Sequence, residues 1–108
     1  MVKASDFENK HFISMMDYSR EELDYILSVA DKMVELEKTG CDLAKGKVLG
    51  SMFFEPSTRT RLSFETAMFR LGGSVTTVAD PMTSSAKKGE TFEDTIGTIS
   101  NYVDIIAM

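Results

Sequence analysis

Four consecutive residues, Ser57-Thr58-Arg59-Thr60, carry the side chains of this sequence that are best suited to bind an anion. They follow an apolar run that stops at Pro56, and an amphipathic helical pattern begins directly after them. This order is typical of a strand, a turn and a helix N-terminus, where free N–H groups and the helix dipole attract negative charge. Hydroxyls and a guanidinium match the oxygens of a phosphate. The stretch therefore predicts a phosphate cradle.

A second arginine, Arg61, lies two positions after Arg59. Side chains two positions apart on a helix do not face the same way, so one arginine would bind the anion and the other would brace the structure. The residue types leave another interpretation open. Ser57 or Thr58 could serve only as a helix N-cap, with both arginines at the surface or in ion pairs.

A second polar stretch, residues 80–89, contains Ser84 and Lys88 among small residues. A lysine is a mobile point charge suited to an anion, but an ordinary solvated loop explains these residue types more simply. The sequence has neither a GxxxxGK[ST] motif nor a GxGxxG motif after a strand. Nothing in the residue pattern therefore supports a nucleotide site.

The elements that would position these loops follow from periodicity, caps and breakers. A capping box at Ser19–Glu22 opens an amphipathic helix that ends near Gly40. The elements expected after it are a buried strand over 47–54, a helix from Ser57 to Gly72-Gly73, a strand over 74–78, a helix from Thr91 to Asn101 and a strand over 103–108.

This alternation, an initial helix followed by β-α-β-α-β, predicts an α/β fold: a parallel sheet with flanking helices. Ligands of such sheets bind outside the carboxyl ends of the strands. The turn at Ser57 follows the first expected strand, and the loop with Ser84 and Lys88 follows the second. Both would lie at the same rim of the sheet.

The totals exclude several classes of protein. A length of 108 residues allows no more than one domain, and a net charge of −5 argues against a general nucleic-acid binder. The only cysteine, Cys41, fits a reducing compartment, so a cytoplasmic location is the default. His11, the only histidine, has no clustered ligands beside it, so no metal site is expected. No apolar run is long enough for a membrane span.

The stretch Phe53–Glu65, read as FFEPSTRTRLSFE, resembles the carbamoyl-phosphate motif of the aspartate and ornithine carbamoyltransferases. The Ser-Thr-Arg-Thr-Arg centre is shared by both branches of the family, and its flanks resemble the aspartate branch. The same holds for Lys87–Thr91, Asp94–Ile96 and Tyr102–Asp104. The resemblance covers essentially the whole chain.

The resemblance implies a role for each residue of the motif. Ser57, Thr58, Arg59 and Thr60 would bind the phosphate of carbamoyl phosphate, and Arg59 would also stabilise the charge of the leaving phosphate. Ser84 and Lys88 would enter the active site of a neighbouring subunit in a homotrimer. Glu55 would pair with arginines of a second domain when the site closes. The implied acceptor is L-aspartate, with no metal or organic cofactor and no nucleic-acid or membrane partner.

The resemblance also implies an extent. Residues 1–108 would form the N-terminal part of a carbamoyl-phosphate-binding domain, without the aspartate-binding domain, so we expect a fragment that is inactive alone. Regulatory chains could attach to the whole protein. Two alternatives stay open: an ornithine-type carbamoyltransferase, and a non-catalytic phosphate-binding or assembly module.

Overall fold

The computed structural model describes residues 1–54, 57–78 and 91–108. Within them the chain divides into two compact units, Met1–Lys38 and Thr39–Met108. Because Glu55, Ser84 and Lys88 lie outside the described residues, the structure bears only on the remaining candidates.

The first unit consists of two short 3-10 turns, η1 (Ala4–Phe7) and η2 (Met15–Asp17), and the helix α1 (Arg20–Thr39). The predicted capping box is confirmed. The Ser19 hydroxyl accepts a hydrogen bond from the Glu22 N–H at 3.1 Å, and the Glu22 carboxylate accepts one from the Ser19 N–H at 2.9 Å. Two of the four open N–H groups at the helix start are thereby satisfied.

A small aromatic cluster holds this unit together. Tyr18 is buried, with Phe7 and Phe12 stacked or tilted against its ring at centroid distances of 6.3 and 4.7 Å. The Lys10 ammonium lies 4.4 Å from the centre of the same ring and is paired with Glu22 at 2.9 Å. The N-terminal segment is thus fastened to the first turn of α1.

The predicted apolar face of α1 is only partly covered. No residue of the helix is buried. Leu23, Ile26 and Met33 on that face are half-buried, whereas Leu27 and Val34 are exposed. The periodicity predicted the helix correctly but did not predict what the helix packs against.

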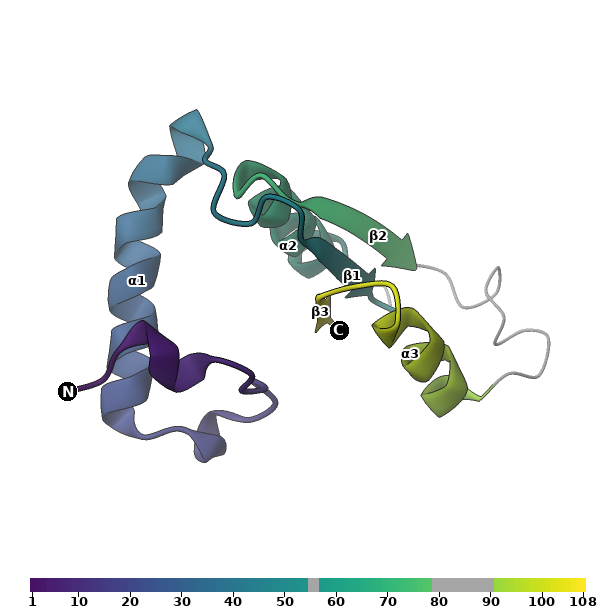
Figure 1. Cartoon of the computed structure of the whole chain (residues 1–108), viewed down its shortest axis with the longest axis horizontal. Coiled ribbons are helices and arrows are strands. Elements are labelled where there is room, and N and C mark those ends of the chain that lie inside the picture. Colours follow the sequence, from purple (N-terminus) through teal and green to yellow (C-terminus); the bar gives the residue numbers. More distant parts are fainter. Residues whose placement is uncertain (55–56, 79–90) are drawn as a thin grey trace. The chain divides into compact units, whose positions relative to one another are not determined.

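The second unit confirms the predicted α/β fold. Three parallel strands form a sheet in the order β2-β1-β3, with α2 behind the β1–β2 pair in Figure 1. The element bounds, one or two residues inside the predicted ranges at several ends, are β1 Val48–Met52, α2 Thr58–Arg70, β2 Ser74–Val78, α3 Phe92–Ser100 and β3 Ile105–Ala107.

The two helices of this unit cover opposite faces of the sheet. Successive residues of a strand point to opposite faces. A side chain added at Gly50 would meet Ile99 and Val103, which end α3 and follow it, at 3.2–3.4 Å. Its neighbour Ser51 points to the other face, where Glu65 of α2 bonds to the strand beside it. The chain therefore leaves β1 toward one face and β2 toward the other.

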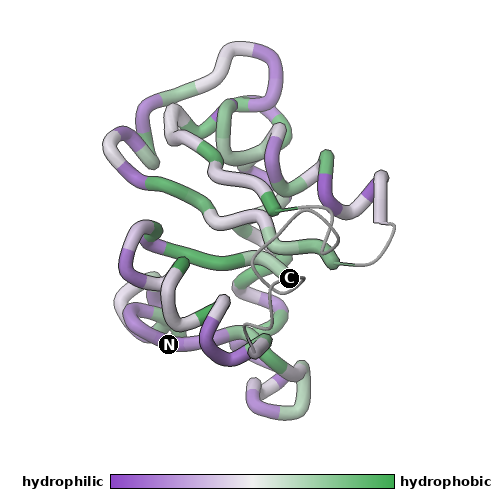
Figure 2. Tube along the Cα trace, turned by 90° about the vertical axis from the view of Figure 1, so that its right-hand side faces the viewer, coloured by the Kyte–Doolittle hydropathy of each residue, from purple (hydrophilic) through white to green (hydrophobic). Residues whose placement is uncertain are grey.

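The core of this unit is built around the central strand. Every residue of β1 after Val48 is buried, whereas β2 and β3 at the edges are mostly exposed or half-buried. The apolar core residues are Leu49, Met52 and Met68, and the trace is hydrophobic again where it ends in β3 (Figure 2). The prediction of a buried strand before the cradle is confirmed.

The turn that ends α2 depends on Gly72. Its φ of +86° lies in the left-handed region, and a side chain added there would stand 2.6 Å from the backbone oxygen of Cys41. A non-glycine residue in this conformation is strained even without that overlap.

We expect Gly72→Ala to lower the free energy of unfolding by about 2 kcal/mol or more, because strain and overlap combine. Gly97→Ala within α3 is the matched control. No atom lies within 4 Å of its added methyl group, so helix propensity should raise stability by up to about 1 kcal/mol. Urea unfolding followed by far-UV circular dichroism measures both. Equal effects of the two substitutions would contradict the account of the turn.

Candidate functional site

The predicted cradle lies at the start of α2, just beyond the carboxyl end of β1. Ser57 occupies the N-cap position, but its hydroxyl makes no cap hydrogen bond. The other capped helices differ, since Ser19 and Thr91 both accept a backbone N–H through their side chains. The interpretation of Ser57 as only an N-cap therefore lacks its defining hydrogen bond.

The first turn of α2 leaves several donors open. The first hydrogen bond of the helix runs from the Arg61 N–H to the Ser57 carbonyl at 2.8 Å. The N–H groups of Thr58, Arg59 and Thr60 precede it and have no acceptor among the described residues. The Arg59 side chain is exposed and makes no ion pair within the same part of the chain. An exposed guanidinium thus accompanies three N–H groups at the positive end of a helix dipole.

Arg61 takes the bracing role that the sequence left to one of the two arginines. Its Nη1 atom lies 3.1 and 3.2 Å from the two carboxylate oxygens of Glu65, one turn further along α2. The Thr77 hydroxyl of β2 donates to the same carboxylate at 3.0 Å. Glu65 therefore ties the start of α2 to the second strand.

The Glu65 side chain is only 12% exposed, yet the pKa of its carboxyl group is lowered. Burial alone acts to raise this pKa, and the surrounding donors Ser51 and Thr77 together with the positive charge of Arg61 outweigh it. The fully buried Ser51 hydroxyl approaches the carboxylate without completing a hydrogen bond of good geometry. The carboxylate is thus held in its charged form inside the helix–sheet contact.

Sequence reasoning missed Glu65, Thr77 and Ser51. The periodicity predicts an apolar face of α2 made of Phe64, Ala67, Met68 and Leu71. Met68 is buried and Leu71 is half-buried, whereas Phe64 and Ala67 are exposed. The less exposed row at that point consists of Arg61, Glu65 and Met68. The four-residue spacing of Arg61 and Glu65 was a usable signal for an ion pair. No comparable signal marks Thr77 or Ser51, because their contacts depend on the pairing of two strands.

The topology adds a second argument for this rim. β1 and β2 are neighbours, and the helices that follow them cover opposite faces of the sheet. In open α/β sheets, ligands bind outside the carboxyl ends of the strands. The start of α2 follows the carboxyl end of β1 at that rim.

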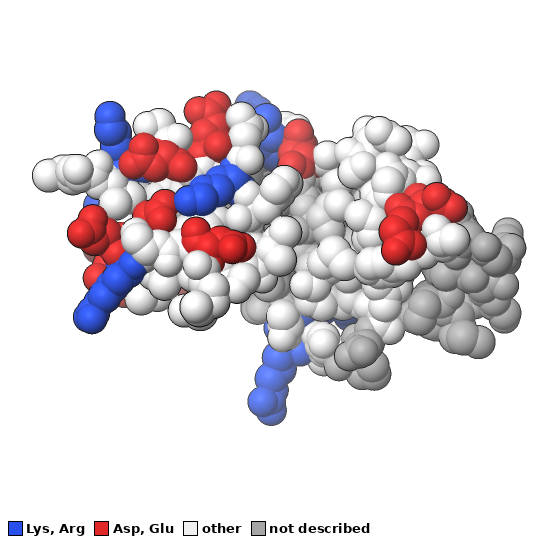
Figure 3. Space-filling model, turned by 90° about the horizontal axis from the view of Figure 1, so that it is seen from below, with Lys and Arg blue, Asp and Glu red and all other residues white. Residues whose placement is uncertain are grey.

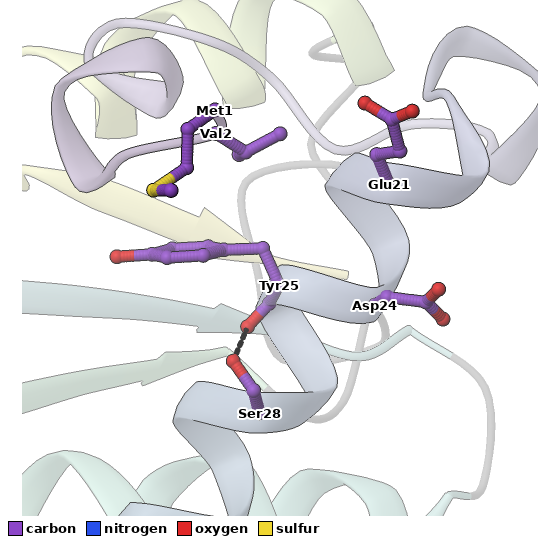
Figure 4. Close-up of a pocket in the computed structure, with 6 residues that line it drawn as sticks. All are labelled: Met1, Val2, Glu21, Asp24, Tyr25 and Ser28. Carbon is purple, nitrogen blue, oxygen red and sulfur yellow. Dashed lines mark hydrogen bonds between the residues drawn. The ribbon is translucent and has the colours of Figure 1, made fainter.

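Other parts of the described structure offer no competing site of this kind. An open depression of about 410 Å³ in the first unit lies around Tyr25, with Glu21 and Asp24 on its rim and no lysine, arginine or histidine (Figure 4). Its charge is wrong for an anion. On the face seen in Figure 3, acidic and basic side chains are interspersed and form no basic patch. Among the described residues, no cluster could hold a metal ion and no helix is long and apolar enough to cross a membrane.

The second unit is an α/β domain, and the start of α2 has the features of an anion site. Comparison with known proteins identifies the family to which the chain belongs. Residues 10–108 match the family model of the aspartate/ornithine carbamoyltransferase carbamoyl-phosphate-binding domain. The chain belongs to this family.

Relatives narrow the assignment within the family. The chain is 48% identical over 105 residues to the aspartate carbamoyltransferase catalytic subunit of Thermococcus kodakarensis, covering 95% of this chain and 34% of the relative. It is 51% identical over 104 residues to that of Methanosarcina mazei, with coverage of 94% and 34%. The chain thus spans about a third of the length of the curated relatives it matches.

Solved structures of aspartate transcarbamoylases are also similar to this chain. The catalytic subunit of M. jannaschii aspartate transcarbamoylase superposes with a TM-score of 0.82 at 56% identity, covering 90% of this chain and 33% of that one. The Trypanosoma cruzi enzyme in complex with carbamoyl phosphate and aspartate gives 0.77 at 37% identity, with coverage of 86% and 31%. The similarity extends well beyond the fold alone.

The lowered pKa of Glu65 predicts a pH dependence of stability. A carboxyl group whose pKa is lower in the folded state stabilises the fold above its unfolded value, near 4.5, and this contribution disappears as the pH falls through the folded value. We therefore expect the thermal midpoint to drop as the pH falls below about 5, and Glu65→Gln to flatten part of that drop. Glu22, whose pKa is also lowered, should account for some of the remainder. An unchanged slope in Glu65→Gln would contradict the charged, held carboxylate.

Proposed function

We propose that residues 1–108 form the N-terminal part of the carbamoyl-phosphate-binding domain of an aspartate carbamoyltransferase catalytic chain. The whole enzyme would transfer the carbamoyl group of carbamoyl phosphate to the amine of L-aspartate, giving N-carbamoyl-L-aspartate and phosphate in pyrimidine biosynthesis. The observation that carries this proposal is the start of α2, where Ser57 makes no side-chain cap and Arg59 and three N–H groups have no partner among the described residues. Sequence identities of 48% and 51% to relatives named aspartate carbamoyltransferase support L-aspartate as the acceptor.

In this proposal Ser57, Thr58, Arg59 and Thr60 receive the phosphate group. N–H groups, hydroxyls and the guanidinium would donate hydrogen bonds to its oxygens, and the helix dipole favours its charge. The aspartate amine attacks the carbamoyl carbon, a tetrahedral intermediate forms, and the C–O bond to phosphate breaks. The departing phosphate gains negative charge, which Arg59 stabilises. Positioning of two reactants and preorganised electrostatics provide the rate enhancement.

The remaining family residues complete the proposal. Ser84 and Lys88 would act in the site of a neighbouring subunit, so that the working enzyme is a homotrimer, to which regulatory chains could bind. Glu55 would pair with arginines of the aspartate-binding domain during closure. Both roles rest on the resemblance of the motifs. A cytoplasmic location is supported by the single, unpaired Cys41.

In this proposal a second domain of the whole enzyme binds aspartate, so residues 1–108 alone would bind the phosphate group without catalysing transfer. Its span of about a third of the relatives supports this part of the proposal. An ornithine-type enzyme is the alternative within the family, and a non-catalytic phosphate-binding module is the alternative outside it. The acceptor used by the longer polypeptide separates all three.

The decisive assay offers carbamoyl phosphate with either aspartate or ornithine to the longer polypeptide that contains this chain. We expect turnover with aspartate only. Arg59→Ala should reduce kcat/KM by about a thousandfold, as expected when a donor to developing charge is lost. Arg20→Ala is the matched control, because Arg20 stands in the first turn of α1 and is 93% exposed. Turnover with ornithine, or equal losses in both variants, would refute the assignment.

A further inference from the structure

The start of α2 is held in place differently from the starts of the other two α-helices. α1 and α3 begin with side-chain caps, whereas the Ser57 hydroxyl makes none. A missing cap leaves a helix start free to fray. Some other contact must therefore fix the turn that carries Arg59.

That contact is the pair of Arg61 and Glu65. The Arg61 N–H holds the Ser57 carbonyl at 2.8 Å, while its side chain bonds to both oxygens of Glu65. Arg61 thus bonds to the N-cap residue through its backbone N–H and to the next turn of the helix through its guanidinium. At 29% exposure the Arg61 side chain is shielded from water more than an ordinary surface pair.

Glu65 extends the link to the sheet. Its carboxylate accepts the Thr77 hydroxyl at 3.0 Å, and Thr77 pairs in register with Ser51 of β1. Ser51 is fully buried, and its hydroxyl has no hydrogen-bond partner among the described residues. Both Ser51 and Thr77 are next to the last residue of their strands, so the link meets the sheet near the carboxyl ends of β1 and β2.

We propose that Glu65 is a positioning residue, which through Arg61 and Thr77 fixes the first turn of α2 against the carboxyl ends of β1 and β2 and so preorganises Arg59 for the phosphate group. This inference rests on the proposed function. Glu65 also neutralises Arg61, so that Arg59 is the cation of this turn without an ion pair among the described residues. A positioning role predicts a selective loss of carbamoyl-phosphate affinity, whereas a merely structural role predicts loss of stability alone.

The test compares Glu65→Gln, Thr77→Val and Arg61→Gln in the longer polypeptide. Glu65→Gln keeps the shape and removes the charge, and Thr77→Val removes only one donor, so it should fold even where the others do not. We expect Glu65→Gln to raise KM for carbamoyl phosphate by about tenfold, the loss of a hydrogen bond to a charged group. KM for aspartate, measured at saturating carbamoyl phosphate, should change less than twofold, roughly within the effect of a surface substitution.

Two controls make the outcome specific. Glu22→Gln removes another ion-paired glutamate, bonded to Lys10 at 2.9 Å in the first unit, and should lower the thermal midpoint without changing either KM. The double variant Arg61→Gln/Glu65→Gln should raise KM for carbamoyl phosphate no more than the larger single effect, because both residues act through one link.

A lower thermal midpoint with unchanged KM in Glu65→Gln and Thr77→Val would overturn the proposal, and so would equal increases of both KM values or multiplicative effects in the double variant. Failure of the proposed function is recognised separately. It would appear as no carbamoylation of aspartate by the unaltered polypeptide, before any substitution is made.

Discussion

The position of the start of α2 depends on the interactions of the Glu65 carboxylate with Arg61 and Thr77. This carboxylate is nearly enclosed between helix and sheet, where an isolated charge would be costly, and it remains charged because Arg61 and Thr77 bond to it. Removing Arg61 would leave the nearly enclosed carboxylate without a positive partner. The contact between α2 and the sheet is therefore polar at the end where the ligand is proposed to bind and apolar at Met68, further along the helix.

The Arg61–Glu65 pair lets one short motif, residues 57–61, meet two opposing structural requirements. A phosphate site needs open N–H groups and a mobile cation, whereas a helix start is usually stabilised by closing those groups with a cap. Among the described residues, the Ser57 hydroxyl and the Arg59 side chain make no cap bond or ion pair, while Arg61 links the turn to Glu65. In the proposed site, alternate residues of one motif would bind and brace, in keeping with their opposite directions on the helix.

Much of the fold could be predicted from the sequence, because its determinants are local. The capping box at Ser19–Glu22, the cap at Thr91 and the breaks at Gly40 and Gly72 all stand where the periodicity ends. The order of elements then implied a parallel sheet and its rim. The contacts of Glu65 with Thr77 and Ser51 could not be predicted, because they depend on strand register between distant segments. The periodicity of α1 likewise could not predict which residues of its apolar face are exposed, such as Leu27 and Val34.

The most direct test of this account is a crystal structure of the longer polypeptide with carbamoyl phosphate bound. The account predicts the phosphate group at the start of α2, its oxygens accepting from the N–H groups of Thr58–Thr60 and from the Arg59 guanidinium. Arg61 should remain on Glu65, with Thr77 still donating to the same carboxylate. A phosphate group bound by Arg61 after release of Glu65, or bound away from the start of α2, would contradict it.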